Sequence, residues 1–246
     1  MNAFSRMKSP PLCLITSLAV LGLLQGSFFC APASAHRHDF PFTYDWKQPA
    51  HGEKEVEAHT TYRKSDTSFE EELEFEYGAT KRFSIAPYVV FGHGPSESLH
   101  YTGFQLEARY QLRKYETSKI LSGLYAEYAK PKDDHAALES RIVLSLYDAH
   151  GGDFSFNYVL SNGFGANPNF QKTYSLGYAF PIGKGAYDVR NGVEWIHDLH
   201  DGHINFGPVV SLKTSDATSL TAGYAFALNH QDANKGEARV IAEYEF

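Results

Sequence analysis

The sharpest chemical feature of the sequence is a ladder of four glutamates at alternate positions, Glu70, Glu72, Glu74 and Glu76. In an extended strand, alternate side chains point to the same face, so these four carboxylates would share one side. Like charges this close repel in a dry interior and need water, cations or arginines around them. The ladder predicts either an acidic wall that favours cations and polar solutes, or a salt-bridged wall that passes little.

A second group with chemical potential is formed by His197, His200 and His203, together with Asp198 and Asp201. Imidazole and carboxylate groups at this spacing are able to hold a divalent transition metal. A three-residue period does not suit neighbouring ligands on a strand, however, and histidines in loops are often simply solvated. Both interpretations stay open.

Composition narrows the classes of partner. The chain has 246 residues, of which 43% are hydrophobic and 15% aromatic, and this content excludes a disordered or collagen-like protein. Asp and Glu number 29 against 22 Lys and Arg, which gives a net charge of -7. With no basic stripe to bind phosphates, we expect no nucleic-acid partner.

Residues 1–35 are predicted to be a cleaved secretory signal peptide. Arg6 and Lys8 form a positive start, residues 12–29 an apolar run, and Ala-Ser-Ala at 33–35 a small-residue cleavage site. Proline and glycine dilute the run, which disfavours an uncleaved anchor. Cleavage would remove both cysteines and leave no disulfide, thiolate nucleophile or cysteine-bound metal.

Beyond residue 36, apolar and polar residues alternate in successive segments separated by Gly, Pro, Asn, Asp and Ser clusters, which is typical of strands. The segment with the glutamate ladder, for example, has Phe69, Leu73, Phe75 and Tyr77 on its other face. About twelve such segments fit between residues 53 and 246. No run of 18 apolar residues follows residue 36, so no transmembrane helix is predicted.

Alternation does not say which face points inward, because a soluble sandwich or barrel also has two unlike faces. A closed sheet fills its interior at about eight strands, and twelve leave a lumen. We therefore expect an all-β, transmembrane, antiparallel up-and-down barrel over residues 53–246, with lipid outside and water inside. A secreted or periplasmic β-sandwich is the main alternative. Residues 36–52 are predicted to be a short periplasmic segment, too short for a globular plug.

The residues predicted to line the lumen are the charged ones on the polar parity. They are Glu70, Glu72, Glu74, Glu76, Glu107, Arg109, Arg141, Arg190, Glu194, Arg239 and Glu243.

The final segment places Tyr244 and Phe246 on the apolar parity. It resembles the C-terminal signature strand of bacterial outer-membrane proteins, and the resemblance implies the barrel-assembly machinery as a partner. Connections after even-numbered segments are short, whereas those after odd-numbered segments are mostly longer. Because short turns are typical of the periplasmic side, both ends of the barrel chain are expected there.

Residues 51–91, HGEKEVEAHTTYRKSDTSFEEELEFEYGATKRFSIAPYVVF, resemble the opening hairpins of outer-membrane channels of the phenol-degradation-pathway (MetA-pathway) type. A Gly-acidic start leads into a strand, and a turn with Tyr77, Gly78, Thr80, Lys81 and Arg82 leads into another. The resemblance implies an outer-membrane channel for hydrophobic or aromatic small molecules.

The sequence thus predicts a passive pore for small solutes in the outer membrane of a Gram-negative-type bacterium, with an acidic lumen. The alternatives are a lipid-modifying hydrolase and a structural or metal-binding barrel without transport. His197 and His230 are the histidines considered for a hydrolase, but no serine stands beside His230, and no nucleophile elbow or phosphate loop occurs. We expect no enzyme activity and no cofactor. The oligomeric state is not predicted.

Overall fold

The computed structural model describes residues 37–113, 120–148, 150–165, 170–182, 188–229 and 236–246. The predicted signal peptide, residues 1–35, lies outside them, as does His230. Among the described residues, no helix is long and apolar enough to cross a membrane.

Twelve strands are present in the described part of the chain. They are β1 (Lys54–Arg63), β2 (Ser68–Gly78), β3 (Phe83–His93), β4 (His100–Gln111), β5 (Ile120–Pro131), β6 (Ala137–Tyr147), β7 (Asp153–Gly163), β8 (Phe170–Pro181), β9 (Asp188–Asp198), β10 (Ile204–Lys213), β11 (Thr218–Ala227) and β12 (Glu237–Glu245).

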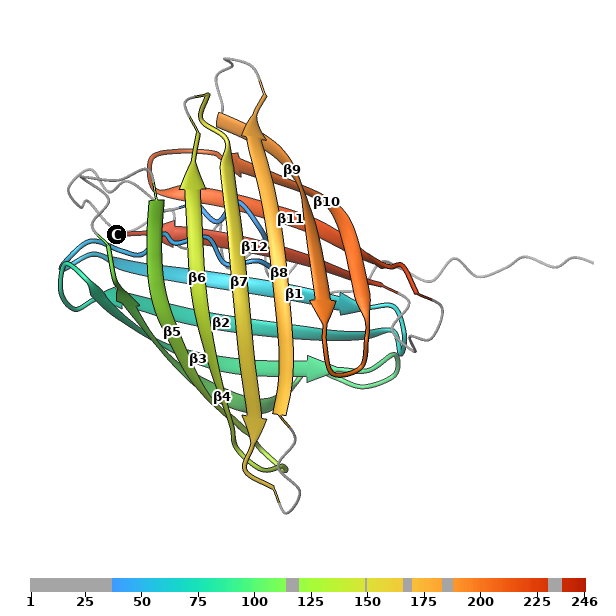
Figure 1. The fold of residues 1–246 in the computed structure, drawn as a ribbon. Helices are drawn as coiled ribbons and strands as arrows, with labels where there is room; N and C mark the ends of the chain where they lie inside the picture. The colour runs from blue at the N-terminus through green and yellow to red at the C-terminus, as the bar shows by residue number, and fades with distance from the viewer. Residues whose placement is uncertain (1–36, 114–119, 149, 166–169, 183–187, 230–235) are drawn as a thin grey trace, which may run out of the picture. The chain divides into compact units, whose positions relative to one another are not determined.

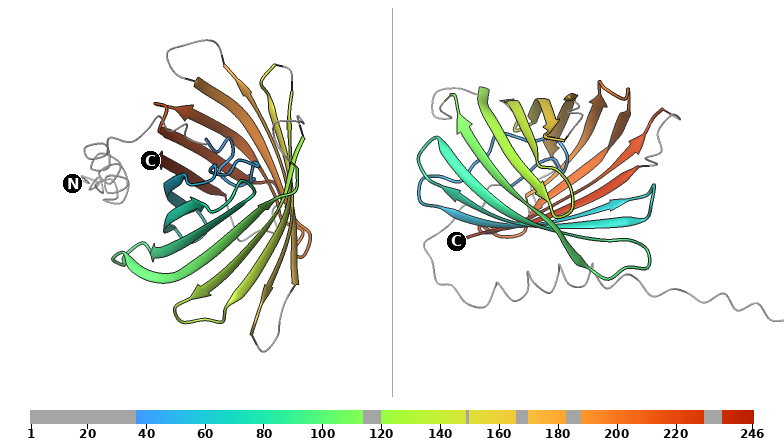
Figure 2. Two further views of the ribbon diagram at one scale, coloured as in Figure 1. Left: turned by 90° about the vertical axis from the view of Figure 1, so that its left-hand side faces the viewer. Right: turned by 90° about the horizontal axis from the view of Figure 1, so that it is seen from below.

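The strands form a closed barrel in which each strand pairs antiparallel with its neighbours in the chain (Figures 1 and 2). The ring closes between β1 and β12, where Glu55 stands opposite Glu245 and Arg63 opposite Glu237. The predicted twelve-stranded up-and-down barrel is confirmed. Closure leaves no sheet edge with unpaired backbone groups, which a strand structure in a bilayer requires.

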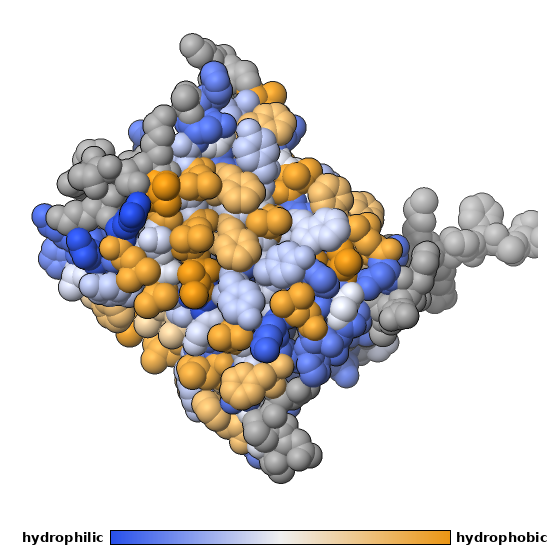
Figure 3. Space-filling model, in the orientation of Figure 1, coloured by the Kyte–Doolittle hydropathy of each residue, from blue (hydrophilic) through white to orange (hydrophobic). Residues whose placement is uncertain are grey.

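The outward face is apolar and exposed. In Figure 3, orange side chains form a broad patch over the middle of β5 to β8, with blue side chains toward the upper ends of these strands. Phe75 is 38% exposed and therefore cannot lie in the core between two sheets. Together with closure of the ring, this excludes the β-sandwich alternative. The outward apolar residues include Leu73, Val89, Phe104, Leu106, Leu124, Ile142, Leu144, Val193, Phe206, Val210 and Phe226.

The inward face is buried most completely in one half of the barrel. We call the edge where β1 begins the proximal edge and the opposite one the distal edge. In β2, which ends at the proximal edge, burial is confined to Glu74, Glu76 and Gly78. In β5, which begins there, Leu121, Gly123 and Tyr125 are the buried residues. Something other than the wall itself must therefore cover the proximal half of the interior.

That cover is the chain just before β1. Residues 37–47, which we call the lumen segment, lie inside the barrel, where they appear in blue in Figure 2. Phe40 and Trp46 are only 2% and 3% exposed. Residues 48–52 then return to the proximal edge, where the Gly52 amide donates to the Gly78 carbonyl at 2.8 Å. The structure differs here from the expectation of a periplasmic segment, because residues 37–47 lie in the lumen. Their aromatic and charged side chains contact the inward side chains of the strands.

The outward face yields a depth-dependent prediction. Ile142 lies in the middle of β6 on the outward face, and Leu138 lies near the distal end of the same strand. Ile142→Arg should lower the free energy of unfolding in lipid vesicles by about 2–4 kcal/mol, because a charge at the bilayer midplane is poorly solvated. Leu138→Arg should cost only about 0–1 kcal/mol. Denaturant titrations giving equal costs at both sites would contradict the membrane orientation.

Candidate functional site

Asp39 anchors the lumen segment to the wall. Its carboxylate, which has no exposed surface, accepts hydrogen bonds from Arg190 Nη1 at 2.6 Å, Lys47 Nζ at 2.8 Å and Arg37 Nε at 3.0 Å. Ser211 Oγ donates a fourth at 3.1 Å. Burial alone would raise the pKa of Asp39, but the three cations outweigh burial and lower it. Asp39 is therefore an ionised carboxylate held by three positive groups.

Tyr44 is held by arginines that project from the wall. The Arg141 guanidinium lies 4.1 Å from the centre of the Tyr44 ring, and that of Arg109 lies 5.1 Å from it. The Tyr125 ring packs edge-on at 5.1 Å between centroids. Guanidinium groups over an aromatic face attract its negative quadrupole, so two residues of the predicted lumen set bind the lumen segment directly.

Two aromatic rings of the lumen segment rest on glycines of the wall. A Cβ atom placed on Gly123 would stand 2.1 Å from the Trp46 ring, and one on Gly177 would stand 2.7 Å from the Phe40 ring. Real Cβ atoms do not approach so closely. The wall is therefore shaped around this segment, because any other residue at Gly123 would displace Trp46.

Side chains of the wall also satisfy the backbone of the lumen segment, which has no strand neighbour to pair with. Each of four strands supplies one acceptor. The amides of His38, Thr43, Tyr44 and Trp46 donate to Glu243 at 3.0 Å, Glu194 at 2.6 Å, Asn157 at 2.8 Å and Ser145 at 2.8 Å, respectively.

The wall of β12, β1 and β2 carries two rows of directly opposed glutamates. Glu57 stands opposite Glu243 on one side and Glu74 on the other. Glu55 stands in the same way between Glu245 and Glu76. All six are at most 1% exposed. Like charges directly opposite each other in a sheet destabilise it, so this wall needs compensation from protons or cations.

The structure places the residues predicted to line the lumen on the inward face, at two depths. Glu74, Glu76, Glu107, Arg109, Glu194 and Glu243 are buried beside the lumen segment. Glu70, Glu72, Arg141, Arg190 and Arg239 are partly exposed. Glu70 pairs with Arg63 at 2.8 Å, and the guanidinium of Arg109 lies between Glu76 and Glu107. In the proximal half, the predicted lumen residues Arg109, Glu76 and Glu107 therefore form ion pairs with one another.

The distal half of the lumen is more open. Several inward residues there are partly exposed, as in the opposed pair Glu127 and Glu139, although Thr61 and Ala225 are buried. Tyr125 donates to Glu127, and Arg141 pairs with Glu139. Partly exposed charged side chains therefore face the lumen on the distal side of the lumen segment.

The three histidines proposed as a metal site are not gathered into one ligand set. His197 Nδ1 lies 2.9 Å from the Tyr174 hydroxyl, and His200 faces Asp201 at 3.7 Å. In the described part of the chain, the groups of three metal-type ligands within reach of one ion lie in the barrel interior instead.

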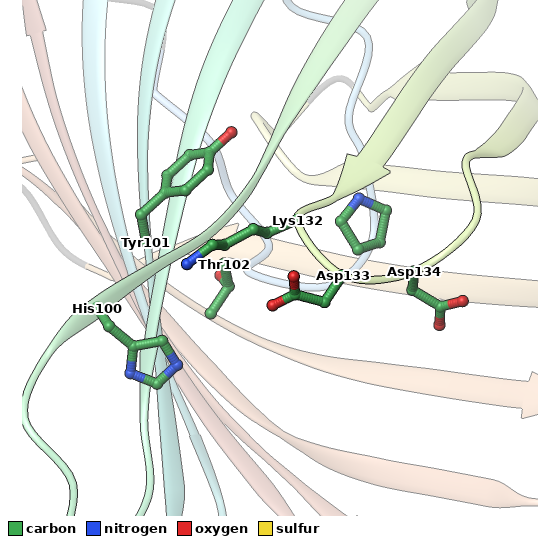
Figure 4. Close-up of a pocket in the computed structure, with 7 residues that line it drawn as sticks. His100, Tyr101, Thr102, Lys132, Asp133 and Asp134 are labelled. Atoms are coloured by element: carbon green, nitrogen blue, oxygen red, sulfur yellow. The ribbon is translucent and has the colours of Figure 1, made fainter.

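A surface hollow lies at the distal edge, lined by the start of β4 and the turn that follows β5 (Figure 4). His100 and Tyr101 line it from one side, and Lys132, Asp133 and Asp134 line it from the other. These side chains are exposed. The residues that line the hollow include no buried cluster of ionisable groups.

Two features of the site are not evident from the sequence pattern alone. One is the lumen segment, whose Trp, Tyr and Phe side chains within eleven residues are a signal for burial. The other is His59, which lies on the polar parity between Glu57 and Thr61 and would have been found by extending that parity along β1.

Comparison with known proteins gives the class of the fold. No protein-family model matches the sequence, and no curated protein matches it. Among solved structures, a KdgM porin in complex with disordered oligogalacturonate has a TM-score of 0.60 at 12% identity, covering 78% of this chain and 99% of its own. An outer-membrane channel from Pseudomonas putida F1 has a TM-score of 0.61 at 11% identity, covering 82% and 98%.

A third structure, the NanC porin, has a TM-score of 0.58 at 9% identity and covers 77% of this chain and 98% of its own. The chain therefore has the fold of outer-membrane porins and channels. At these identities the likeness concerns the fold alone, and the resemblance of residues 51–91 to the phenol-degradation type stays a prediction.

The glycine contact predicts that the lumen segment can be displaced by one side chain. Gly123→Leu should expel Trp46 from the wall and shift its fluorescence to longer wavelength, measured in a Trp195→Phe background so that one tryptophan reports. Gly163→Leu is the matched control, because nothing lies within 4 Å of a Cβ at that position. Unchanged emission in the folded Gly123→Leu protein would contradict the placement of Trp46.

The ion pairs of Asp39 predict that its removal will loosen the lumen segment from the barrel wall. In Asp39→Ala, Lys47 keeps Asp45 and Arg37 keeps Asp188, whereas Arg190 loses its carboxylate partner. Docking of the lumen segment should therefore weaken by about 1–3 kcal/mol. Limited proteolysis between residues 37 and 52 should then become faster, whereas Asp66→Asn, at an exposed turn, should leave the rate unchanged. Since the pKa of Asp39 is below its usual 3.8, this stabilisation is present above that pH and is lost below it. Protection that persists in Asp39→Ala would refute the anchor.

Proposed function

We propose that the protein is an outer-membrane channel for small polar solutes, narrowed in its proximal half by the lumen segment. The observation that carries the proposal is a closed barrel with an apolar outer face and a charged, partly open interior. An apolar belt on a closed barrel suits a bilayer, and a charged interior needs water. The distal half supplies a wet compartment, and the lumen segment determines what passes beyond it.

The charge of the interior supports a preference for cations and neutral polar solutes. Carboxylates outnumber cationic groups among the fully buried inward residues, and the two glutamate rows lie beneath the lumen segment, so they act on a solute through their negative potential and not by contact. An acidic pore wall attracts cations and repels anions. This wall also favours polar solutes over the hydrophobic or aromatic molecules implied by the resemblance of residues 51–91.

The membrane orientation and the export route belong to the same proposal. The proximal edge faces the periplasm, because both ends of the barrel chain lie there. The connections at the two edges differ little in length, with four to eight residues at the proximal edge and four to nine at the distal edge. Residues 1–35 direct export and are removed, and Tyr244 and Phe246 are read by the barrel-assembly machinery. Phe246 packs near Phe75 on the outer surface, with 6.4 Å between ring centroids, so it is accessible from the lipid side.

An enzyme is not favoured by the geometry. A hydrolase at the lipid interface needs a serine, a histidine and an acid in hydrogen-bond contact. Of the histidines considered, His197 contacts the Tyr174 hydroxyl and not a serine, and His230 lies outside the described residues.

Conductance in planar bilayers tests the channel. The wild-type protein should give small, discrete, cation-preferring steps, and Gly123→Leu should give larger ones, because displacing Trp46 widens the proximal half. Gly163→Leu should match the wild type. Glu127→Gln should reduce the cation preference, since Glu127 lines the distal compartment. Silence of both the wild type and Gly123→Leu, with lipid hydrolysis in mixed micelles, would support the hydrolase instead.

A further inference from the structure

One part of the acidic wall has the composition of a metal site. Glu57 and His59 on β1 and Glu74 on β2 each offer a ligand atom, and these atoms lie within 4.8 Å of one another. All three residues are buried, with exposures of 0%, 5% and 1%. One imidazole and two carboxylates are a ligand set that Zn²⁺ accepts, with a fourth position left to water.

The distances between these atoms suit a small ion. His59 Nε2 lies 2.8 Å from Glu57 Oε2 and 3.8 Å from Glu74 Oε2. Tetrahedral ligands at ordinary zinc bond lengths stand about 3.3 Å apart, which lies between these two values. Small side-chain rotations would therefore bring all three atoms onto one ion.

The orientation of His59 is set by an independent contact. Its other ring nitrogen, Nδ1, lies 3.2 Å from Glu72 Oε2. A proton on Nδ1 shared with Glu72 leaves the Nε2 lone pair directed at Glu57 and Glu74. A carboxylate behind a histidine is the usual outer partner of a metal-bound imidazole, because it fixes the tautomer and makes the ligand more basic.

Glu74 gives a second sign that a ligand is missing. Neither of its buried carboxylate oxygens has a hydrogen-bond partner among the described residues. The nearest cationic atoms are His59 Nε2 at 3.8 Å and Arg109 Nη2 at 4.0 Å, both beyond hydrogen-bond distance. A buried carboxylate without donors is costly, and an ion between Glu74 and His59 would supply the missing interaction.

Outer contacts surround the other ligands too. The second oxygen of Glu57, Oε1, lies 3.2 Å from Nε2 of His38 in the lumen segment. Glu57 also stands opposite Glu243 on β12, so a divalent ion would offset two of the three negative charges in this glutamate row.

We infer that the barrel wall binds one divalent transition-metal ion, of which Zn²⁺ is the probe, through Glu57 Oε2, His59 Nε2 and a carboxylate oxygen of Glu74. Binding releases any proton carried by Nε2 of His59, which keeps its Nδ1 proton toward Glu72. Since all three ligands lie on β1 and β2, the site belongs to the wall and does not depend on channel activity. The lumen segment supplies no ligand and adds only the outer contact from His38.

Equilibrium dialysis with Zn²⁺ tests this inference on the full mature chain, purified without a histidine tag and stripped with a chelator. The wild type should retain one Zn²⁺ per chain by elemental analysis. His59→Gln should lose that ion, and Glu72→Gln should weaken its binding about 10- to 100-fold, because it removes only the outer partner. His200→Gln, in the exposed β9–β10 turn, is the matched control and should bind as the wild type does.

The outcomes separate the possible sources of bound metal. Equal Zn²⁺ in His59→Gln and the wild type would overturn the site, and loss in His200→Gln alone would assign the metal to the turn. If His59→Gln does not fold, as judged by heat-dependent gel migration, Co²⁺ added to the wild type decides. Strong visible d–d bands of low coordination number support the site, whereas weak bands of six-coordinate Co²⁺ overturn it. Zinc retained by Gly123→Leu shows independence from the lumen segment.

Discussion

A closed sheet of this many strands encloses more space than its own inward side chains can fill, and the remaining structure follows from that constraint. Part of the space is left open, and inward glutamates and arginines require water there. The chain itself fills another part, because residues 37–47 turn back into the barrel before β1 begins. The two halves of the lumen therefore differ: Glu127 and Glu139 remain accessible in the distal half, whereas Glu57 and Glu74 are sealed in the proximal half.

Much of the fold could be predicted from the sequence because a strand has a side-chain period of two. The alternation of Leu73 and Phe75 with Glu74 and Glu76 is enough to separate an apolar face from a charged one, and counting such segments decides between a filled barrel and one with a lumen. Local pattern sufficed there because every strand pairs with its neighbour in the chain. The depth of each inward residue was not predictable in this way, because alternation says nothing about what covers it.

The content of the lumen was missed for a physical reason. A short segment cannot fold into a globular plug alone, but it needs no core of its own when a wall supplies one. Trp46 packs on Gly123, and Tyr44 contacts Arg141, although the residues of each pair are far apart in sequence. Only the three-dimensional register brings such pairs together. The role of His59 was not predictable for a simpler reason. A single histidine among glutamates has no distinctive sequence pattern, and its contact with Glu72 on the next strand is known only from the structure.

The path of the lumen segment bears on how the protein is assembled. Arg37, where the described chain begins, is bonded to Asp188, the first residue of β9, and residues 50–53 are bonded around Gly78, the last residue of β2. Both positions lie at the proximal edge, so residues 37–53 begin and end at the same opening of the barrel. The segment is a loop inserted from one edge of the barrel, and it does not pass through the barrel to the other edge. The barrel can therefore close first and accept the segment afterwards, with no topological obstacle to either order.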